Sequence, residues 1–284
     1  MASGLLEKRQ VEQVLSRFVS PSVARRMIGG LKQIELGGRE VTATVVFADI
    51  AGFTRLSETL APEAVAELLN AYFDAIATAA RCYRGTIDKY IGDGAMLVFG
   101  VPEADEEHVF HALCCAVMIQ RLTDELNLRR ASQGKTTVGL RIGVHSGCML
   151  AGNLGAHDRM EYTVVGDAVN LASRLCNAAG SGEILASEEL VSGANIRSRL
   201  RYQAAGSLSV RGRAQPVDTA QVGDVYPEAA RLMARRIDDF LTLLQRRDGA
   251  AGAAAGLTAS ENAATAAGSS DDVATTSAKV PPDA

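Results

Sequence analysis

The chain has 284 residues, of which 47% are hydrophobic, so it is long and apolar enough to bury a substantial core. Its formal net charge is −4 and it contains no basic block, which argues against a surface for nucleic acid or anionic lipid. Its apolar runs are too short to cross a bilayer, and the N-terminus lacks the apolar stretch of a signal peptide, so we expect a cytoplasmic protein with no transmembrane segment.

The first part of the chain is predicted to be helical and the next part to form a strand. Apolar residues recur at helical spacing within residues 5–28, and Ser20-Pro21 has the form of a helix start. Residues 39–49 are β-branched and alternating, which is typical of a strand. That strand ends in the carboxylate of Asp49, followed within three residues by Gly52.

A helix, a hairpin and a second helix follow. The apolar stripe that begins after Pro62 predicts a helix to about Tyr83. The segment GTIDKYIGDGAMLVFG (85–100) contains two strand-like runs around Asp93-Gly94, a strong hairpin signal. Residues 105–128 again have a helical pattern.

Further short elements complete the predicted domain. We expect strands near 137–150 and 160–165, then a helix from about Asp167 to the Ala-Ala-Gly at 178–180. Residues 183–226 contain three short strand-like runs (EILA, RYQAAGSLSV and VDTAQV) around a helix-like EELVSG.

The predicted organisation has four parts, which end in a tail without apolar bulk. An amphipathic helix is expected over 227–247, and the Ala/Gly/Ser/Thr-rich remainder is expected to be disordered. The parts are an N-terminal helical segment (1–38), a main domain (39–226), the amphipathic helix (227–247) and the tail (248–284).

The order of strand, helix, hairpin, helix and strand predicts an α+β fold with a ferredoxin-like, split βαβ core sheet flanked by helices. In that topology the first strand lies beside the third and runs opposite to it. The end of the first strand then meets the tip of the hairpin. We therefore expect Asp49 and Asp93 to lie side by side, although they are distant in sequence.

Two neighbouring carboxylates predict a site for a hard divalent cation. Like charges at close range are costly unless a cation lies between them. Oxygen ligands without Cys or His favour Mg²⁺ or Mn²⁺, and Mg²⁺ takes its remaining ligands from phosphate and water. The loop 51–54 allows backbone N–H groups to approach anionic oxygens at Gly52. The chain has no P-loop motif.

A second group of polar residues lies on the helix expected from Asp167. Asn170 and Arg174 are spaced i, i+4 and project from one helical face. An arginine in that position is suited to stabilise charge that develops on a phosphorus atom. Spacing alone favours a structural interpretation, in which Asn170 bonds back to its own helix and Arg174 is a solvated surface charge.

Three motifs, in this order and at these intervals, resemble those of the class III nucleotidyl cyclases: FADIAGFTRLSE, DKYIGDGAMLVFG and EYTVVGDAVNLASR. The resemblance covers roughly residues 40–225. It implies the conversion of ATP to 3′,5′-cyclic AMP and pyrophosphate by a two-metal mechanism, in which Mg²⁺ or Mn²⁺ ions activate the ribose 3′-hydroxyl and neutralise the leaving group.

The resemblance also implies a role for each matching residue. Two ions would be held by Asp49, Asp93 and the Ile50 carbonyl, Asn170 would orient the ribose and Arg174 would bind the α-phosphate. The remaining substrate-binding residues would be Gly52, Phe53, Thr54, Lys89, Thr163 and a basic residue of VRGR, either Arg211 or its rival Arg213.

Lys89 and Thr163 match the two base-reading positions of the family. A lysine donates to adenine N1, whereas guanine carries a proton there, so Lys89 favours ATP over GTP. Thr163 stands where adenylyl members often have aspartate, and its hydroxyl can accept from the adenine amino group. The Lys/Thr pair resembles the bicarbonate-responsive subset of the family, which predicts stimulation by bicarbonate.

A single copy of each motif implies a head-to-tail homodimer with two composite sites. In the family the metal-binding aspartates come from one subunit, and the residues at the base, ribose and α-phosphate come from its partner. The helices at 5–28 and 227–247 either strengthen this dimer or pack on their own domain. Two other functions remain open: a guanylate cyclase, and a catalytically silent nucleotide-binding or dimerisation module.

Overall fold

The structure is a computed structural model that describes residues 23–24, 36–209 and 215–267. The chain divides into one unit spanning Met1–Ile237, which contains the sheet, and a second spanning Asp238–Ala284. The helical segment predicted over 5–28 lies outside the described residues, apart from Val23 and Ala24, which are helical and buried.

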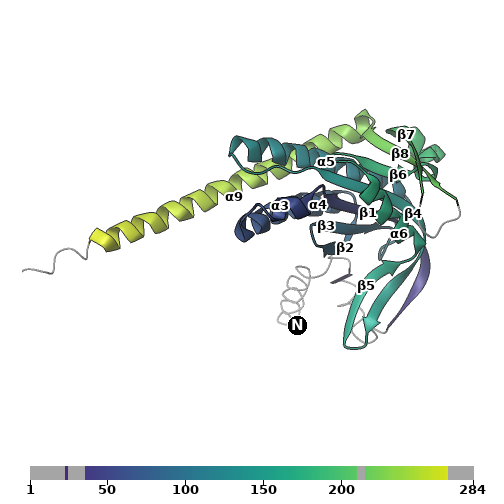
Figure 1. The fold of residues 1–284 in the computed structure, drawn as a ribbon, viewed down its shortest axis with the longest axis horizontal. Helices are drawn as coiled ribbons and strands as arrows, with labels where there is room; N and C mark the ends of the chain where they lie inside the picture. Colours follow the sequence, from purple (N-terminus) through teal and green to yellow (C-terminus); the bar gives the residue numbers. More distant parts are fainter. Residues whose placement is uncertain (1–22, 25–35, 210–214, 268–284) are drawn as a thin grey trace, which may run out of the picture. The chain divides into compact units, whose positions relative to one another are not determined.

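A mixed sheet of eight described strands forms the centre of the first unit (Figure 1). The strand order is β2-β3-β1-β4-β6-β8-β7, and β5 pairs with β4 off this path. The strands are β1 (Gly37–Ile50), β2 (Thr86–Ile91), β3 (Gly94–Phe99), β4 (Leu140–Ala156), β5 (Arg159–Val165), β6 (Ile184–Ser187), β7 (Leu200–Leu208) and β8 (Val217–Val225).

Helices of the first unit cover both faces of this sheet. They are α3 (Phe53–Ser57), α4 (Pro62–Cys82), α5 (His108–Ser132), α6 (Asp167–Ala178), α7 (Glu188–Ser192) and α8 (Ala194–Arg197). Helix α9 (Pro227–Ala267) follows β8, begins in the first unit and continues into the second. Side chains alternate between the two faces along β1. Thr44 points to α5, where its hydroxyl lies 2.7 Å from His108 Nδ1. Ala43 and Val45 therefore face the other side, where they join the apolar cluster that includes α6.

The predicted α+β, split βαβ arrangement is confirmed. β1 pairs in antiparallel register with β3 on one side and with β4 on the other. The β2–β3 hairpin turns at Gly92-Asp93, and the predicted helices before and after it are α4 and α5. β1 itself extends slightly beyond the predicted 39–49.

β4 is longer than the strand predicted over 137–150, because it runs to Ala156. Its first part pairs with β6, its whole length up to Asn153 pairs with β1, and its last seven residues pair with β5. Pairing with neighbours therefore extends the strand through a glycine-containing sequence in which local β-propensity is weak.

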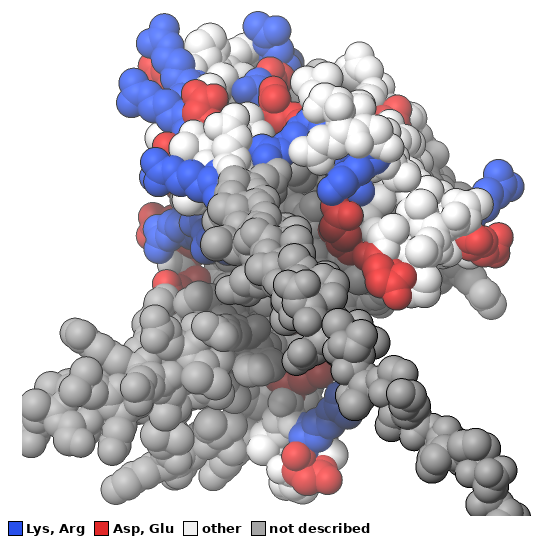
Figure 2. Space-filling model, turned by 90° about the vertical axis from the view of Figure 1, so that its left-hand side faces the viewer, with Lys and Arg blue, Asp and Glu red and all other residues white. Residues whose placement is uncertain are grey.

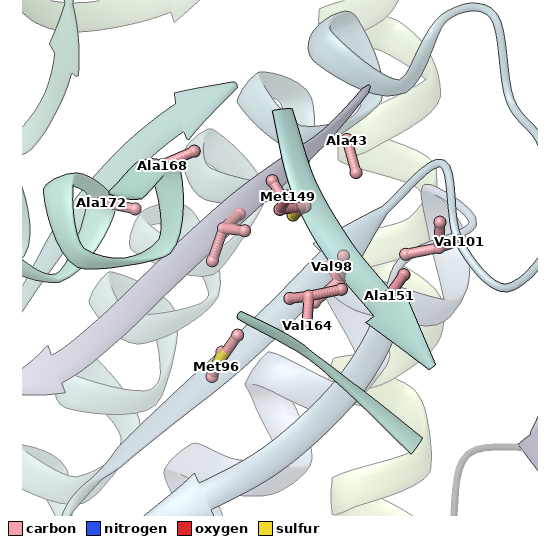
Figure 3. Close-up of a cluster of buried hydrophobic side chains, with 10 residues drawn as sticks. Ala43, Met96, Val98, Val101, Met149, Ala151, Val164, Ala168 and Ala172 are labelled. Carbon is pink, nitrogen blue, oxygen red and sulfur yellow. The ribbon is translucent and has the colours of Figure 1, made fainter. Parts of the chain in front are cut away.

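The main apolar cluster on the α6 side joins four strands to the helix (Figure 3). Its side chains are small or flexible, which lets strands and helix approach closely. They are Ala43, Val45, Met96, Val98, Val101, Met149, Ala151, Val164, Ala168 and Ala172. Because each of these residues is at most 4% exposed, the strand ends that border the cluster are held in a fixed arrangement.

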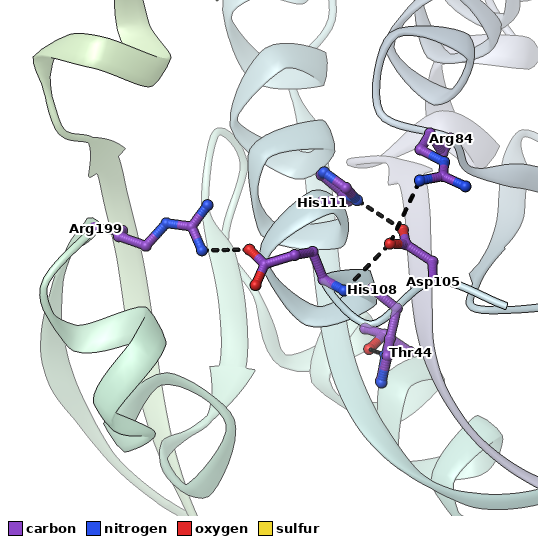
Figure 4. A network of polar contacts seen from close by, with 7 residues as sticks. Thr44, Arg84, Asp105, His108, His111 and Arg199 are labelled. Atoms are coloured by element: carbon purple, nitrogen blue, oxygen red, sulfur yellow. Dashed lines mark hydrogen bonds and ion pairs between the residues drawn. The ribbon is translucent and has the colours of Figure 1, made fainter.

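On the opposite face, a polar network fixes the start of α5 (Figure 4). His108 contacts the fully buried Thr44 of β1, and His111 Nδ1 lies 2.6 Å from Asp105 Oδ2. Arg84, which follows α4, lies 3.9 Å from the same carboxylate. Burial opposes ionisation of Asp105, but the hydrogen bond and charge of His111 lower its pKa. The network therefore links α5 to both β1 and the end of α4.

Helix α9 continues beyond residue 247, where the apolar stripe led us to end it, and runs to Ala267. The sequence from 248 to 267 is rich in alanine, which has the highest helix propensity of all residues, so the helix continues without an apolar face. The tail predicted to begin at 248 thus starts within a helix, and residues 268–284 lie outside the described residues.

Two surface properties bear on partners. On the face drawn in Figure 2, the basic and acidic side chains of the described residues are interspersed. Within the described part of the chain, no helix combines the length and the apolar character that a membrane span requires.

Candidate active site

The site begins at the end of β1, where Asp49 is the penultimate residue of the strand. Its side chain is 21% exposed, whereas the following Ile50 is almost fully buried. By alternation from Ala43 and Val45, Asp49 lies on the sheet face that α6 covers. The strand therefore presents this carboxylate at the border between core and solvent.

Asp93 lies at the tip of the β2–β3 hairpin, beside Asp49. Ala48 of β1 pairs with Ala95 of β3, which places the next residues of the hairpin against the end of β1. A Cβ atom added to Gly94 would lie 3.0 Å from Asp49 Oδ1. Burial and the negative charge of Asp49 together raise the pKa of Asp93. The topology thus brings together the two acids that the sequence predicted to meet.

Arg141 of β4 completes this group, and sequence reasoning missed it. Its Nε donates to Asp49 Oδ2 at 2.8 Å, and its Nη2 donates to the same oxygen. Burial acts to lower the pKa of Arg141, but the hydrogen bond with Asp49 and the charge of Asp49 raise it above its usual value. The register of β1 and β4 places Arg141 directly opposite Asp49. Only that register could have revealed the pair, because Arg141 belongs to none of the motifs.

The loop after β1 contains the predicted substrate-binding residues Gly52, Phe53 and Thr54. Gly52 has φ of 73°, in the left-handed region, and α3 begins at Phe53. A Cβ atom at Gly52 would meet no atom within 4 Å, so the backbone conformation and not crowding favours glycine here. The five-residue helix α3 follows this loop, and Leu56 N–H donates to the Gly52 carbonyl at 3.3 Å.

Asn170 and Arg174 project from the outer face of α6. Asn170 is exposed and Arg174 is partly buried, whereas the opposite face of the helix is buried against the sheet. The two side chains share one face, as their spacing predicted.

Glycines of β4 allow α6 to lie directly on the strand. A Cβ atom added to Gly143 would come within 2.2 Å of both the Ala172 carbonyl oxygen and the Cys176 backbone nitrogen. A Cβ atom at Gly147 would lie 3.0 Å from the methyl group of Ala168. The height of α6 above the sheet, and with it the position of Asn170 and Arg174, therefore depends on Gly143.

Replacement of Gly143 by alanine is expected to push α6 away from β4. Overpacking of this kind costs about 1–3 kcal/mol of folding free energy. Urea denaturation should therefore show a lower midpoint, and nucleotide turnover should fall because α6 carries two site residues. The matched control is Gly193→Ala, because that Cβ atom would meet nothing closer than 3.9 Å. Equal midpoints for both variants would show that α6 does not depend on Gly143.

The predicted base-reading residues lie in one hydrogen-bonded network. Lys89 of β2 donates to Glu161 Oε2 at 2.8 Å, and its Nζ lies 3.4 Å from Asp88 Oδ1. Thr163 of β5 donates from its hydroxyl to the same Asp88 oxygen at 3.0 Å. Sequence reasoning named Lys89 and Thr163 and missed the two carboxylates that hold them.

Two predicted residues cannot be placed, because Arg211 and Arg213 lie outside the described residues. The choice between them as the triphosphate contact stays a prediction.

The donor set at Asp49 and Asp93 fits hard divalent cations. Among the described residues, no group of three or more His, Cys, Asp or Glu side chains gathers as a metal site. The pair of carboxylates leaves most coordination positions to substrate phosphate and water, which is how Mg²⁺ commonly binds beside nucleotides. The Ile50 carbonyl, which the resemblance implies as a further ligand, belongs to the residue directly after Asp49.

Comparison with known proteins gives a consistent result. A family model described as adenylate and guanylate cyclase catalytic domain matches residues 38–223. Adenylate cyclase 1 of Rhizobium meliloti (strain 1021) is 33% identical over 200 residues, which make up 68% of this chain and 30% of that protein. The chain spans about two fifths of the length of other curated relatives that it matches.

Two solved structures are also similar. The adenylyl cyclase CyaB from P. aeruginosa is 38% identical with a TM-score of 0.63, over 66% of this chain and 97% of that one. The guanylyl cyclase Cya2 is 32% identical with a TM-score of 0.63, over 67% of this chain and 95% of that one.

Proposed function

This chain belongs to the family of adenylate and guanylate cyclase catalytic domains, and we propose that it is an adenylate cyclase that converts ATP to 3′,5′-cyclic AMP and pyrophosphate. The observation that carries the proposal is the contact between the end of β1 and the β2–β3 hairpin, where a Cβ atom at Gly94, the residue after Asp93, would lie 3.0 Å from Asp49 Oδ1. Two acids held together at the border of the core form a site for divalent cations beside a triphosphate.

Each of the proposed site residues has a separate role in the reaction. Asp49, Asp93 and the Ile50 carbonyl would hold two Mg²⁺ or Mn²⁺ ions, which supply Lewis-acid activation of the 3′-hydroxyl and charge neutralisation at the leaving pyrophosphate. Asn170 orients the ribose for in-line attack. Arg174 donates to the α-phosphate oxygens, on which negative charge develops.

Specificity for ATP rests on Lys89 and Thr163. The Lys89 ammonium has only donors, which suits the unprotonated N1 of adenine and opposes the N–H at the same position of guanine. Glu161 and Asp88 hold this ammonium group, and although burial opposes it, these carboxylates raise the pKa of Lys89. Lys89 therefore remains a donor throughout the physiological range.

The catalytic unit is a homodimer with two composite sites. Asp49 and Asp93 come from one subunit, and the Lys89–Thr163 pair and the α6 residues come from its partner. Support comes from the family to which the chain belongs and from the single set of motifs that the chain carries.

Product identification tests the proposal. The purified chain is incubated with ATP or GTP in the presence of Mn²⁺ or Mg²⁺, and the products are separated and identified by mass. We expect cyclic AMP from ATP at a higher rate than cyclic GMP from GTP. An excess of cyclic GMP would make the chain a guanylate cyclase. A folded dimer that forms neither product would be a silent nucleotide-binding module.

The Lys/Thr pair also predicts that bicarbonate raises turnover. Initial rates of cyclic AMP formation are measured with millimolar additions of bicarbonate at fixed pH, with chloride as the matched salt. Equal rates in the two salts would remove bicarbonate as an activator and leave the cyclase activity unaffected.

A further inference from the structure

Asp88 is a nearly buried carboxylate between the two residues proposed to read the base. Its side chain is 4% exposed, and it accepts the Thr163 hydroxyl proton at 3.0 Å. It lies on β2, one residue before Lys89, while Thr163 lies on β5. The proposed function gives Asp88 a contact with Lys89 but no role toward Thr163.

The surroundings of Asp88 supply hydrogen-bond donors. The Lys89 ammonium lies 3.4 Å from Oδ1, and the Thr163 hydroxyl donates to the same atom. Burial raises the pKa of Asp88, while hydrogen bonds from Thr163, Lys89 and the Val164 backbone oppose that increase. With these donors directed at it, the carboxyl group acts as the acceptor in its hydrogen bond with the Thr163 hydroxyl.

A threonine hydroxyl by itself does not distinguish an amino group from a carbonyl group. It has one proton to donate and two lone pairs to accept, and it rotates to suit its partner. It can therefore accept from the 6-amino group of adenine or donate to the 6-oxo group of hypoxanthine or guanine. When the Thr163 hydroxyl donates its proton to Asp88, only its oxygen lone pairs are available to the base, and lone pairs can only accept a hydrogen bond.

We propose that Asp88 fixes the polarity of Thr163, so that this hydroxyl acts only as an acceptor and selects purines that carry a 6-amino group. Asp88 is then a positioning residue for specificity, which acts on the base through Thr163. The inference rests on the proposed function, since it assumes that Thr163 faces the purine of the bound nucleotide.

The test compares ATP with purine riboside triphosphate, which lacks the 6-amino group but keeps N1. Because both nucleotides keep the contact with Lys89, the ratio of their kcat/KM values reports position 6 alone. A hydrogen bond of this kind is worth about 3- to 10-fold in that ratio for the wild-type chain. Thr163→Val should bring the ratio close to that of a site with no contact at position 6.

Asp88→Asn is the informative variant because it keeps the size of the side chain. The amide has one acceptor oxygen for three donors, so its nitrogen turns to Thr163 and donates to the hydroxyl. We expect the ratio to fall as it does in Thr163→Val, and the use of inosine triphosphate relative to ATP to rise. Asp88→Leu, which removes the acceptor completely, should give the same loss and decides the question if the asparagine variant is unstable.

Two comparisons separate this role from a structural one. In a Thr163→Val background, Asp88→Asn should not change the ratio further, because the hydroxyl on which it acts is absent. Glu161 contacts Lys89 but has no hydrogen bond with the Thr163 hydroxyl, so the Glu161→Gln variant should keep the wild-type ratio.

Two results would overturn the inference while the proposed function stands. One is that Asp88→Asn and Asp88→Leu keep the wild-type ratio of kcat/KM values while Thr163→Val does not. The other is an equal change caused by Asp88→Asn with and without the Thr163 hydroxyl. A wild-type chain that forms no cyclic product from ATP would refute the proposed function, and this inference with it.

Discussion

Asp93→Asn is expected to abolish cyclic AMP formation while the fold becomes more stable. The amide removes one of the two carboxylates that we propose hold the divalent ions, and loss of a single stabilising donor already costs about 10²- to 10³-fold in rate. We therefore expect a loss of at least about 10³-fold. Turnover with saturating ATP and Mn²⁺ measures the effect.

The gain in stability follows from the pKa of Asp93. Burial and the charge of Asp49 raise this pKa, so the ionised side chain destabilises the folded chain above its unfolded-state pKa, and the destabilisation is relieved as the pH falls. A neutral asparagine removes that cost at pH 7. The melting temperature without added metal should therefore be higher than that of the wild type.

Asp124→Asn is the matched control. Burial also raises the pKa of Asp124, but this residue lies on the exposed side of α5. Its variant should keep the wild-type turnover. An active Asp93→Asn enzyme, or one that loses activity only because it unfolds, would contradict the assignment of Asp93.

Arg174→Ala is expected to reduce turnover by about 10²- to 10³-fold, since it removes a donor to the α-phosphate. The stronger prediction concerns mixtures. Asp93→Asn and Arg174→Ala chains place their defects in different halves of a composite site, so a heterodimer contains one site with no defect. With random pairing, coexpression should restore about one quarter of the wild-type activity.

The control mixture combines Asp49→Asn with Asp93→Asn. Both defects then lie in the same half of the site, so no heterodimer has an intact site and activity should stay low. If the first mixture also stays inactive while differently tagged chains copurify as dimers, the two groups act within one chain and the composite site is wrong.

The proximity of Asp49 and Asp93 could be predicted from sequence because it depends on topology. The alternation within β1, the Asp-Gly turn and the two intervening helices leave few ways to arrange the first three strands. That arrangement alone brings Asp49 to Asp93. The shared helical face of Asn170 and Arg174 could be predicted just as directly from their spacing.

The partners of these residues could not be predicted because they depend on register and on distant strands. Arg141 contacts Asp49 because one particular alignment of β1 and β4 places them opposite each other. A shift by one residue would move the apolar side chains of one strand to the wrong face of the sheet. The sequence of a single strand nevertheless does not specify its offset from the neighbouring strand. Asp88 meets Thr163 only because β5 folds back along β4.

The end of α9 shows a third limit. Amphipathic periodicity stops near residue 247, and we ended the helix there, but α9 runs to Ala267. Backbone hydrogen bonding and alanine propensity extend a helix without any apolar face, so periodicity sets a minimum length for the element and does not locate its end.

The central claim is that the acids from two turns bind divalent ions around a triphosphate, and Mn²⁺ binding measures this directly. Free Mn²⁺ is followed by electron paramagnetic resonance as the chain is added to a fixed mixture of Mn²⁺ and the unreactive α,β-methylene analogue of ATP, so that any further loss of free Mn²⁺ comes from the chain. We predict that the wild-type chain removes Mn²⁺ from solution and that Asp49→Asn and Asp93→Asn chains bind it far more weakly. Unchanged Mn²⁺ binding in both variants would contradict the account.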